Sequence, residues 1–209
     1  MRGVKQNLTD RYKMPAGRPR NFDTDAALDA AMRVFWQYGY EGTSLDLLTR
    51  KMQINRPSLY GAFGDKADLF EKAIVRYQEK HAGPNLRVLA QAPNLEAALA
   101  DYFAATLGLV AGKSTPRGCL VACVLADVCA NDPRWRRLMG SIATASRSQF
   151  SAALERFVPP RTAQRLANLL LVCGPGLAVL ARSGATNQEL ADACNVARAA
   201  CCAIGMETA

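Results

Sequence analysis

The 209-residue sequence contains a single histidine, His81, and none of its seven cysteines forms a C-x-x-C pair. A zinc site of the usual cysteine and histidine type is therefore not expected. The odd number of cysteines also argues against a structural disulfide framework. Paired carboxylate motifs, a glycine-rich phosphate loop and a nucleophile elbow are missing as well. These absences make an enzyme the weakest interpretation, and we expect neither a cofactor nor a metal.

Long apolar runs are missing too. No such run is long enough to span a bilayer, and the N-terminus lacks an apolar segment of the secretory type. We therefore expect a cytoplasmic protein with no membrane partner. β-branched residues are sparse while alanine and leucine are abundant, which favours an all-α fold.

The positive charge of the chain is concentrated at its start. The formal net charge is +8, and residues 1–20 hold six basic residues against one acidic residue, so they carry +5 of it. A basic arm on a nearly neutral body suits a polyanion such as DNA. A solvated leader is the alternative for residues 1–14. Arg18 and Arg20 lie directly before the first predicted helix, and we expect them to contact nucleic acid.

Apolar spacing and capping residues predict four helices in the first part of the chain. The first covers residues 24–38 and ends at Gly39. Residues 43–52 begin with a sequence typical of a capping box. After the turn of residues 53–55, a third, short helix begins at its cap Asn55 and ends near residues 63–64, and Asp65 caps a fourth that runs to about residue 81.

Gly83-Pro84 predicts a boundary between two units, a DNA-binding domain over residues 21–82 and a larger helical domain over residues 83–209. Further helices are expected over residues 86–91, 94–111, 119–130, 132–157, 161–182 and 187–204.

The second and third predicted helices, joined by a turn of three residues, form a helix-turn-helix. In such a motif the second helix lies in the major groove of DNA. Arg56 is suited to a guanine edge, and Gly61 would allow close approach to the groove. An ordinary helical hairpin with a polar outer face is the alternative. The predicted DNA-contacting residues are Thr43, Ser44, Asn55, Arg56, Pro57, Ser58, Tyr60, Gly61 and Lys66.

The segment from Asp25 to Phe70 resembles the DNA-binding domain of TetR-family transcriptional regulators. The resemblance rests on Phe35, Gly39-Tyr40, Thr43-Ser44, Ser58-Leu59-Tyr60, Phe63, Lys66 and Leu69-Phe70. It implies an all-α homodimer with a three-helix DNA-binding domain. It further implies a C-terminal domain that binds a small effector and dimerises through its last two long helices.

The resemblance also implies roles for individual residues. Side chains at Thr43, Tyr60 and Lys66 would contact phosphates, while Asn55 to Ser58 and Gly61 would read the groove. The sequence departs from the family at Gln53, where glycine is usual. If this turn residue is left-handed, glutamine costs about 1 kcal/mol there.

Three cysteines lie together in the C-terminal half. Cys119 and Cys123 are four residues apart and share one helix face, with Cys129 further along. This segment is similar to that of TetR-family repressors that sense electrophiles such as N-ethylmaleimide. The similarity implies that Cys119 is a sensor and Cys129 a second site. A helix N-terminus and Arg117 would favour the thiolate of Cys119, whereas ordinary packing is the alternative.

Aromatic residues of the C-terminal half, among them Tyr102, Phe103 and Trp135, are candidates for an effector pocket, with plain core packing as the alternative. Small residues at helical spacing in the last two helices suit a four-helix dimer interface. These residues are Ala178, Ala181, Ala193, Ala197 and Ala200.

The combined pattern predicts a regulator that binds double-stranded DNA, most simply a repressor released from a near-palindromic operator by a small molecule or an electrophile. A TetR-like activator or dual regulator is the first alternative. A helical interaction protein without DNA binding is the second.

Overall fold

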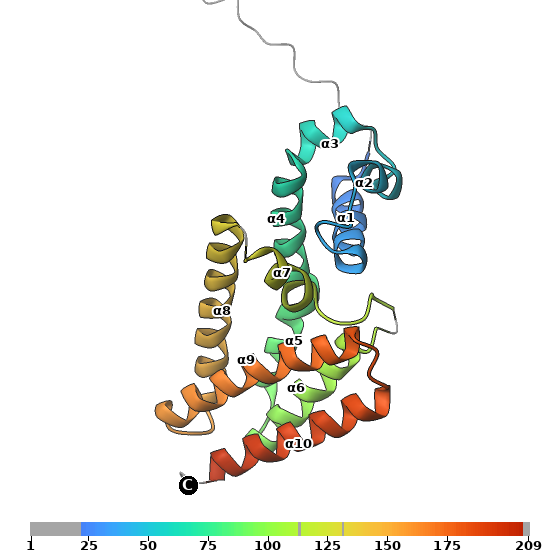
Figure 1. The fold of residues 1–209 in the computed structure, drawn as a ribbon. Coiled ribbons are helices and arrows are strands. Elements are labelled where there is room, and N and C mark those ends of the chain that lie inside the picture. The colour runs from blue at the N-terminus through green and yellow to red at the C-terminus, as the bar shows by residue number, and fades with distance from the viewer. Residues whose placement is uncertain (1–21, 113, 131, 207–209) are drawn as a thin grey trace, which may run out of the picture.

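The computed structural model describes residues 22–112, 114–130 and 132–206, and these residues form helices without a strand (Figure 1). The all-α prediction is confirmed. The helices are α1 (Thr24–Tyr38), α2 (Leu45–Met52), α3 (Arg56–Phe63), α4 (Lys66–Tyr77), α5 (Gly83–Gln91), α6 (Leu95–Val110), α7 (Ala126–Val128), α8 (Pro133–Leu154), α9 (Pro160–Arg182) and α10 (Asn187–Met206).

Figure 1 shows α1, α2 and α3 gathered at one end of the molecule, with α9 and α10 crossing the other end. Helix α4 runs from the first group toward the second. The predicted caps explain why the first helices begin where they do. Asp23 accepts hydrogen bonds from the first turn of α1, and Ser44 and Asn55 do the same for α2 and α3. The short helices are thus placed by their capping residues.

The N-terminal helices enclose an aromatic core. Phe35 of α1 packs edge-on against Phe70 of α4, with ring centroids 5.0 Å apart. Trp135, from the start of α8, joins the same core at 5.0 Å from Phe70 and 5.7 Å from Tyr40. A residue of the C-terminal half therefore completes the core under the helix-turn-helix.

A second core lies between α6, α9 and α10. Its fully buried residues include Leu99, Leu166 and Leu170. Ala178 and Ala181 also face this core and are at most 1% exposed. They therefore cannot contribute to a dimer interface as the sequence suggested. The exposed large apolar residues of α9 and α10 are instead Val172, Val179, Leu180, Val196 and Met206.

The helical backbone does not end before Gly83-Pro84. A π-helical segment (Gln78–Ala82) follows α4 directly and continues into α5 without a turn. The Gly83 amide donates to the Gln78 carbonyl, and Pro84 lies in the first turn of α5, where its missing N–H costs little. The π-helical turn therefore links α4 to the C-terminal half.

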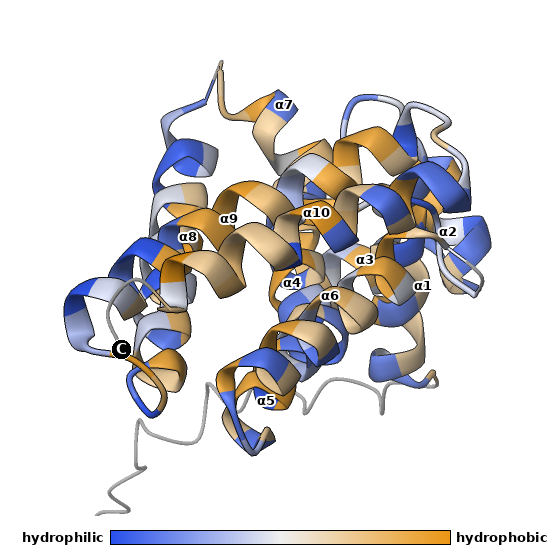
Figure 2. Cartoon of the chain, turned by 90° about the horizontal axis from the view of Figure 1, so that it is seen from below, coloured by the Kyte–Doolittle hydropathy of each residue, from blue (hydrophilic) through white to orange (hydrophobic). Residues whose placement is uncertain are grey.

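Helix α9 is long and apolar enough to cross a membrane, contrary to the sequence-based expectation, although length and composition alone are weak evidence. A third of the most apolar 18-residue stretch of α9 is buried inside the protein. Figure 2 shows apolar residues on the side of α9 seen from below. Helix α9 thus has apolar residues on two faces. One face packs in the second core, and the other is exposed.

Candidate nucleic-acid interface and effector cavity

Helix α3 presents one face to the core and the other to solvent. Leu59 and Phe63 are at most 5% exposed and hold the helix in the core, next to α2 and α4. Arg56 and Gly61 lie on the opposite, exposed side, and Tyr60 is 49% exposed. Nothing lies within 4 Å of the position that a Cβ atom would take at Gly61. No side chain of the protein therefore blocks a close approach of this face to a DNA groove.

The turn before α3 holds Gln53 in the left-handed conformation, with φ 57° and ψ 38°. Within the described residues it is the one non-glycine with positive φ. The left-handed conformation considered for this position is therefore present. Two hydrogen bonds hold this turn. The amides of Gln53 and Ile54 both donate to the Thr49 carbonyl, the second at 3.1 Å.

Two predicted contact residues have structural tasks of their own. The Asn55 side chain accepts a 2.8 Å hydrogen bond from the Ser58 amide and so caps α3, next to Pro57 in its first turn. The Ser44 hydroxyl accepts a 3.1 Å bond from the Leu47 amide at the start of α2. Both residues are exposed, so capping leaves the remainder of each side chain open to solvent.

Thr43 is not at the surface. Its side chain is 1% exposed, and its hydroxyl donates to the Gly39 carbonyl at 2.5 Å. In this conformation the hydroxyl closes the loop between α1 and α2 and is not presented to a phosphate, so its contact with DNA stays a prediction. Thr43 therefore positions the motif from within.

Arg56 pairs with Asp46 of α2 across the front of the motif, with 2.8 Å between Arg56 Nη2 and Asp46 Oδ1. Both side chains are more than half exposed. Exposed pairs of this kind contribute little to stability. The guanidinium can therefore leave Asp46 for a guanine edge or a phosphate at small expense.

Tyr60 and Lys66 flank the exposed face of α3. Lys66 Nζ lies 4.4 Å from the centre of the Tyr40 ring, a cation–π contact that orients the ammonium group. Partial burial lowers the pKa of Lys66. The Tyr60 ring and the Lys66 ammonium group thus lie beside the exposed face of α3, where contact with a DNA backbone stays a prediction. Arg18 and Arg20 lie outside the described residues.

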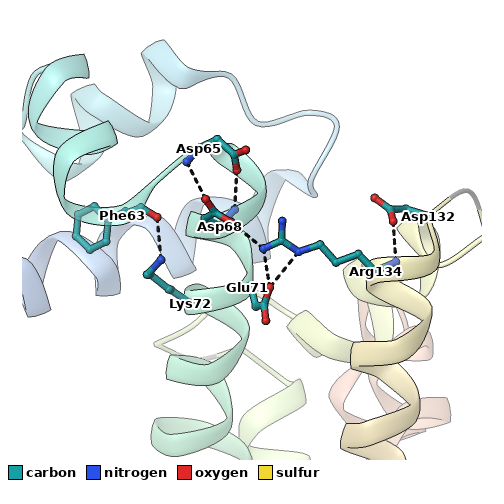
Figure 3. Close-up of polar contacts among 7 residues, drawn as sticks. All are labelled: Phe63, Asp65, Asp68, Glu71, Lys72, Asp132 and Arg134. Carbon is teal, nitrogen blue, oxygen red and sulfur yellow. Dashed lines mark hydrogen bonds and ion pairs between the residues drawn. The ribbon is translucent and has the colours of Figure 1, made fainter.

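Helix α4 holds the end of α3 in place. Lys72 Nζ donates a 2.9 Å hydrogen bond to the Phe63 carbonyl, the last residue of α3 (Figure 3). At the start of α4, Asp65 and Asp68 form a capping box in which each carboxylate accepts from the other's amide. A movement of α4 would therefore carry α3 with it.

Arg134 ties α8 to α4 in the same view. Its guanidinium donates to Glu71 at 2.6 and 3.0 Å and to Asp68 at 2.9 Å (Figure 3). The hydrogen bond from Arg134 lowers the pKa of the Asp68 carboxyl. This latch joins the C-terminal half to the helix that supports α3.

A second arginine holds α1 from the far end of the chain. Arg182, the last residue of α9, donates to the carbonyls of Trp36 and Gln37 at 2.6 and 3.1 Å. These carbonyls belong to the last turn of α1, which has no partner of its own for them. Neither Arg134 nor Arg182 could be predicted from the sequence, because their partners lie more than 60 residues away and leave no local signal.

A cavity of about 480 Å³ lies between the C-terminal helices. Tyr77 and Gln78 border it at the end of α4, and α6, α8 and α9 supply most of the remainder. Among its described lining residues Arg147 alone carries a charge, and that side chain is exposed. The volume and apolar lining are those of a small-molecule site.

Only some of the predicted effector residues line this cavity. Tyr102 and Cys119 line it, whereas Phe103, Cys123, Cys129 and Trp135 do not. Trp135 lies in the aromatic core under the helix-turn-helix and not in the wall of this cavity. Phe103 is 2% exposed and belongs to the second core. Cys123 directs its thiol toward the Ala178 carbonyl, at 3.6 Å.

The environment of Cys119 differs from the expected one. Arg117 turns away from it and donates to the carbonyls of Ala181, at 3.1 Å, and Ala185, at 2.6 Å. Burial raises the pKa of the Cys119 thiol, although the Ala122 amide donates to its sulfur at 3.4 Å. The expected thiolate is therefore not favoured, because burial outweighs the helix N-terminus.

The supported recognition helix and the separate apolar cavity define a helix-turn-helix protein of the ligand-responsive class. Comparisons with known proteins agree. The family model described as "Bacterial regulatory proteins, tetR family" matches residues 27–73. The HTH-type transcriptional repressor ComR of Escherichia coli (strain K12) is 33% identical over 196 residues, 87% of this chain and 90% of that protein. The chain therefore belongs to the TetR family of bacterial transcription regulators.

Solved structures agree with this assignment. The TetR-family regulator CifR, solved as a cysteine mutant with a 26-base-pair double-strand operator DNA, is 32% identical, with a TM-score of 0.78 over 88% of this chain and 99% of that one. Reduced E. coli NemR is 20% identical, with a TM-score of 0.70 over 83% and 93% of the two chains, which supports the fold alone. As a TetR-family member the chain is a DNA-binding transcription factor and not an enzyme. Regulators of this family bind operator DNA as dimers.

Proposed function

We propose that this protein is a repressor that binds a near-palindromic operator as a homodimer and leaves it when a small molecule enters the cavity. The exposed face of α3 carries the proposal, because Tyr60 and Gly61 stand clear of the body while Leu59 anchors the helix. The relative ComR is a transcriptional repressor, which supports repression as the direction of regulation. We place this activity in the cytoplasm.

We propose residues 21–82 as the DNA-binding domain and residues 83–209 as the effector and dimerisation domain, with residues 1–20 as a basic arm on the DNA. The dimer would form through α9 and α10. Val172, at 68% exposure, Val179, at 52%, and Val196, at 71%, support this arrangement, because such side chains gain most from a partner. A four-helix interface would also cover the apolar outer side of α9.

The Gly61→Ala variant separates DNA binding from folding. Gly61 lies within α3 and a methyl group there meets no atom within 4 Å, so the free energy of unfolding should rise by about 0.5–1 kcal/mol. The same methyl group would stand between α3 and the groove, and we expect operator affinity to fall at least about tenfold, or about 1.4 kcal/mol. Urea unfolding and fluorescence anisotropy measure the two effects.

Gly140→Ala is the matched control, since Gly140 also lies within a helix, α8, with nothing near its virtual Cβ. It should gain similar stability and keep full affinity for DNA. Unchanged operator affinity in Gly61→Ala would contradict the placement of α3 in the groove.

An electrophile is a second candidate effector, because Cys119 borders the cavity. Since burial raises the pKa of this thiol, its thiolate population increases as the pH rises toward that pKa. We therefore expect N-ethylmaleimide to release the operator slowly at neutral pH and faster at higher pH, and Cys119→Ala to abolish the response. Anisotropy across a pH series measures this, and alkylated Cys119 with unchanged operator binding rules the route out.

A further inference from the structure

Three arginine side chains line one surface pocket where the two halves of the protein meet. Arg33 comes from α1, Arg117 from the segment after α6, and Arg182 from the end of α9. The pocket has a volume of about 680 Å³, and no acidic side chain is present among its described lining residues. Residues 102–126 and 156–188, which supply Arg117 and Arg182, contain no aspartate or glutamate. Positive charge is therefore concentrated in one concave site.

The fold does not neutralise this charge. Within the described part of the chain, none of the three arginines forms an ion pair. Asp29 lies one helical turn before Arg33 on α1, where it could serve as a partner. Its carboxylate instead pairs with Arg76, at 2.8 Å, and with Lys80. The counter-charge for the pocket must therefore come from outside the described chain.

Backbone carbonyls hold the guanidinium groups in position. Arg117 donates to carbonyls at and just beyond the end of α9, and Arg182 donates to carbonyls in the last turn of α1. Arg33 donates to the Ser114 carbonyl at 3.0 Å. A carbonyl accepts a hydrogen bond but carries no net charge, so these bonds orient each guanidinium and leave its positive charge in place. The site is thus arranged before a ligand arrives.

Arg33 and Arg182 keep donors for a ligand. Both residues are exposed. A guanidinium has five N–H donors, of which Arg33 uses one and Arg182 uses two within the described residues. The planar group binds phosphate oxygens through paired hydrogen bonds. Two such groups beside a third positive charge are suited to two linked phosphates, which offer more oxygens and more negative charge than one.

We propose that the pocket of Arg33, Arg117 and Arg182 binds a small molecule that carries a diphosphate group. The volume leaves room for an organic group attached to the diphosphate. Figure 1 shows the end of α9 and the segment after α6 below α1, whereas α3 lies above it, so the ligand is distinct from DNA phosphate on α3. A bound diphosphate would join α1 to the C-terminal half. Its binding requires neither DNA nor the apolar cavity and so goes beyond the proposed function.

Calorimetric titration of the full-length protein with inorganic pyrophosphate, without DNA or divalent cations, tests this site. At an ionic strength of about 0.15 M, which weakens contacts with scattered surface charges, we expect one site per chain with a dissociation constant below about 1 mM. Inorganic phosphate should bind at least about tenfold more weakly. Arg33→Gln should weaken pyrophosphate binding at least about tenfold. This variant should fold as the parent does, because Arg33 is exposed and makes a single hydrogen bond.

Arg50→Gln is the matched control, since Arg50 is an exposed arginine on α2 and does not line the pocket. Both variants lose the same charge and keep the basic residues at the start of the chain, but Arg50→Gln should keep full affinity for pyrophosphate. In a thermal unfolding scan, excess pyrophosphate should raise the unfolding temperature of the parent and of Arg50→Gln more than that of Arg33→Gln. Absence of binding to the parent below about 1 mM, or equal affinity of the two variants, overturns the inference.

Discussion

Replacing Val172 and Val179 together with aspartate is expected to convert the protein into a monomer. The two residues lie seven positions apart on α9 and so share one face, on which both are more than half exposed. Aspartate in an apolar contact would lose its hydration without a partner. A monomer binds only one half-site, so operator affinity should fall about 10²–10⁴-fold. Analytical ultracentrifugation and anisotropy measure the two results.

Val75→Asp is the control for this prediction. Val75 is 48% exposed on α4, away from α9 and α10, so the same substitution there should leave the dimer intact. A double variant that still sediments as a dimer would move the interface away from the outer side of α9.

The Trp135→Ala variant is expected to lose about 3–5 kcal/mol of unfolding free energy. Trp135 is 2% exposed and packs edge-on against Phe70 and Tyr40, so alanine would leave a large cavity in the aromatic core. Such a loss is a large part of the total stability of an ordinary domain. Urea unfolding followed by circular dichroism measures it.

Tyr38→Ala provides the comparison, because Tyr38 is an aromatic residue at 46% exposure and its loss should change stability by at most about 0.5 kcal/mol. If Trp135→Ala were as stable as Tyr38→Ala, the aromatic core would not depend on α8. Since Trp135 belongs to the C-terminal half and its partners to the N-terminal half, we also expect both halves to unfold in one transition.

Local signals were sufficient for much of the fold. Helix α1 begins at Thr24 and ends at Tyr38 as predicted, because Asp23 and Gly39 are strong start and stop signals. Asp65 likewise marks the start of α4. The helix continues through Gly83-Pro84 because proline in a first helical turn does not oppose a continuing helix.

The site could be predicted only where one helix forms it. The outward residues of α3 follow from helical spacing, whereas the burial of Thr43 depends on a bond to Gly39 that the sequence does not reveal. Trp135 shows the same limit on a larger scale. An apolar side chain has no mark that distinguishes a core from a cavity wall, and in this protein contacts with Phe70 decided the matter.

The central claim, that α3 reads a specific operator, is tested most directly by selecting genomic DNA fragments with the purified protein and sequencing those that remain bound. We predict one enriched sequence with two inverted halves, bound more weakly as salt rises because arginine and lysine contacts release counterions from phosphate. The Gly61→Ala variant should recover the same sequence in much lower yield. A selection that enriches no sequence, or binding that is indifferent to salt, would contradict the account.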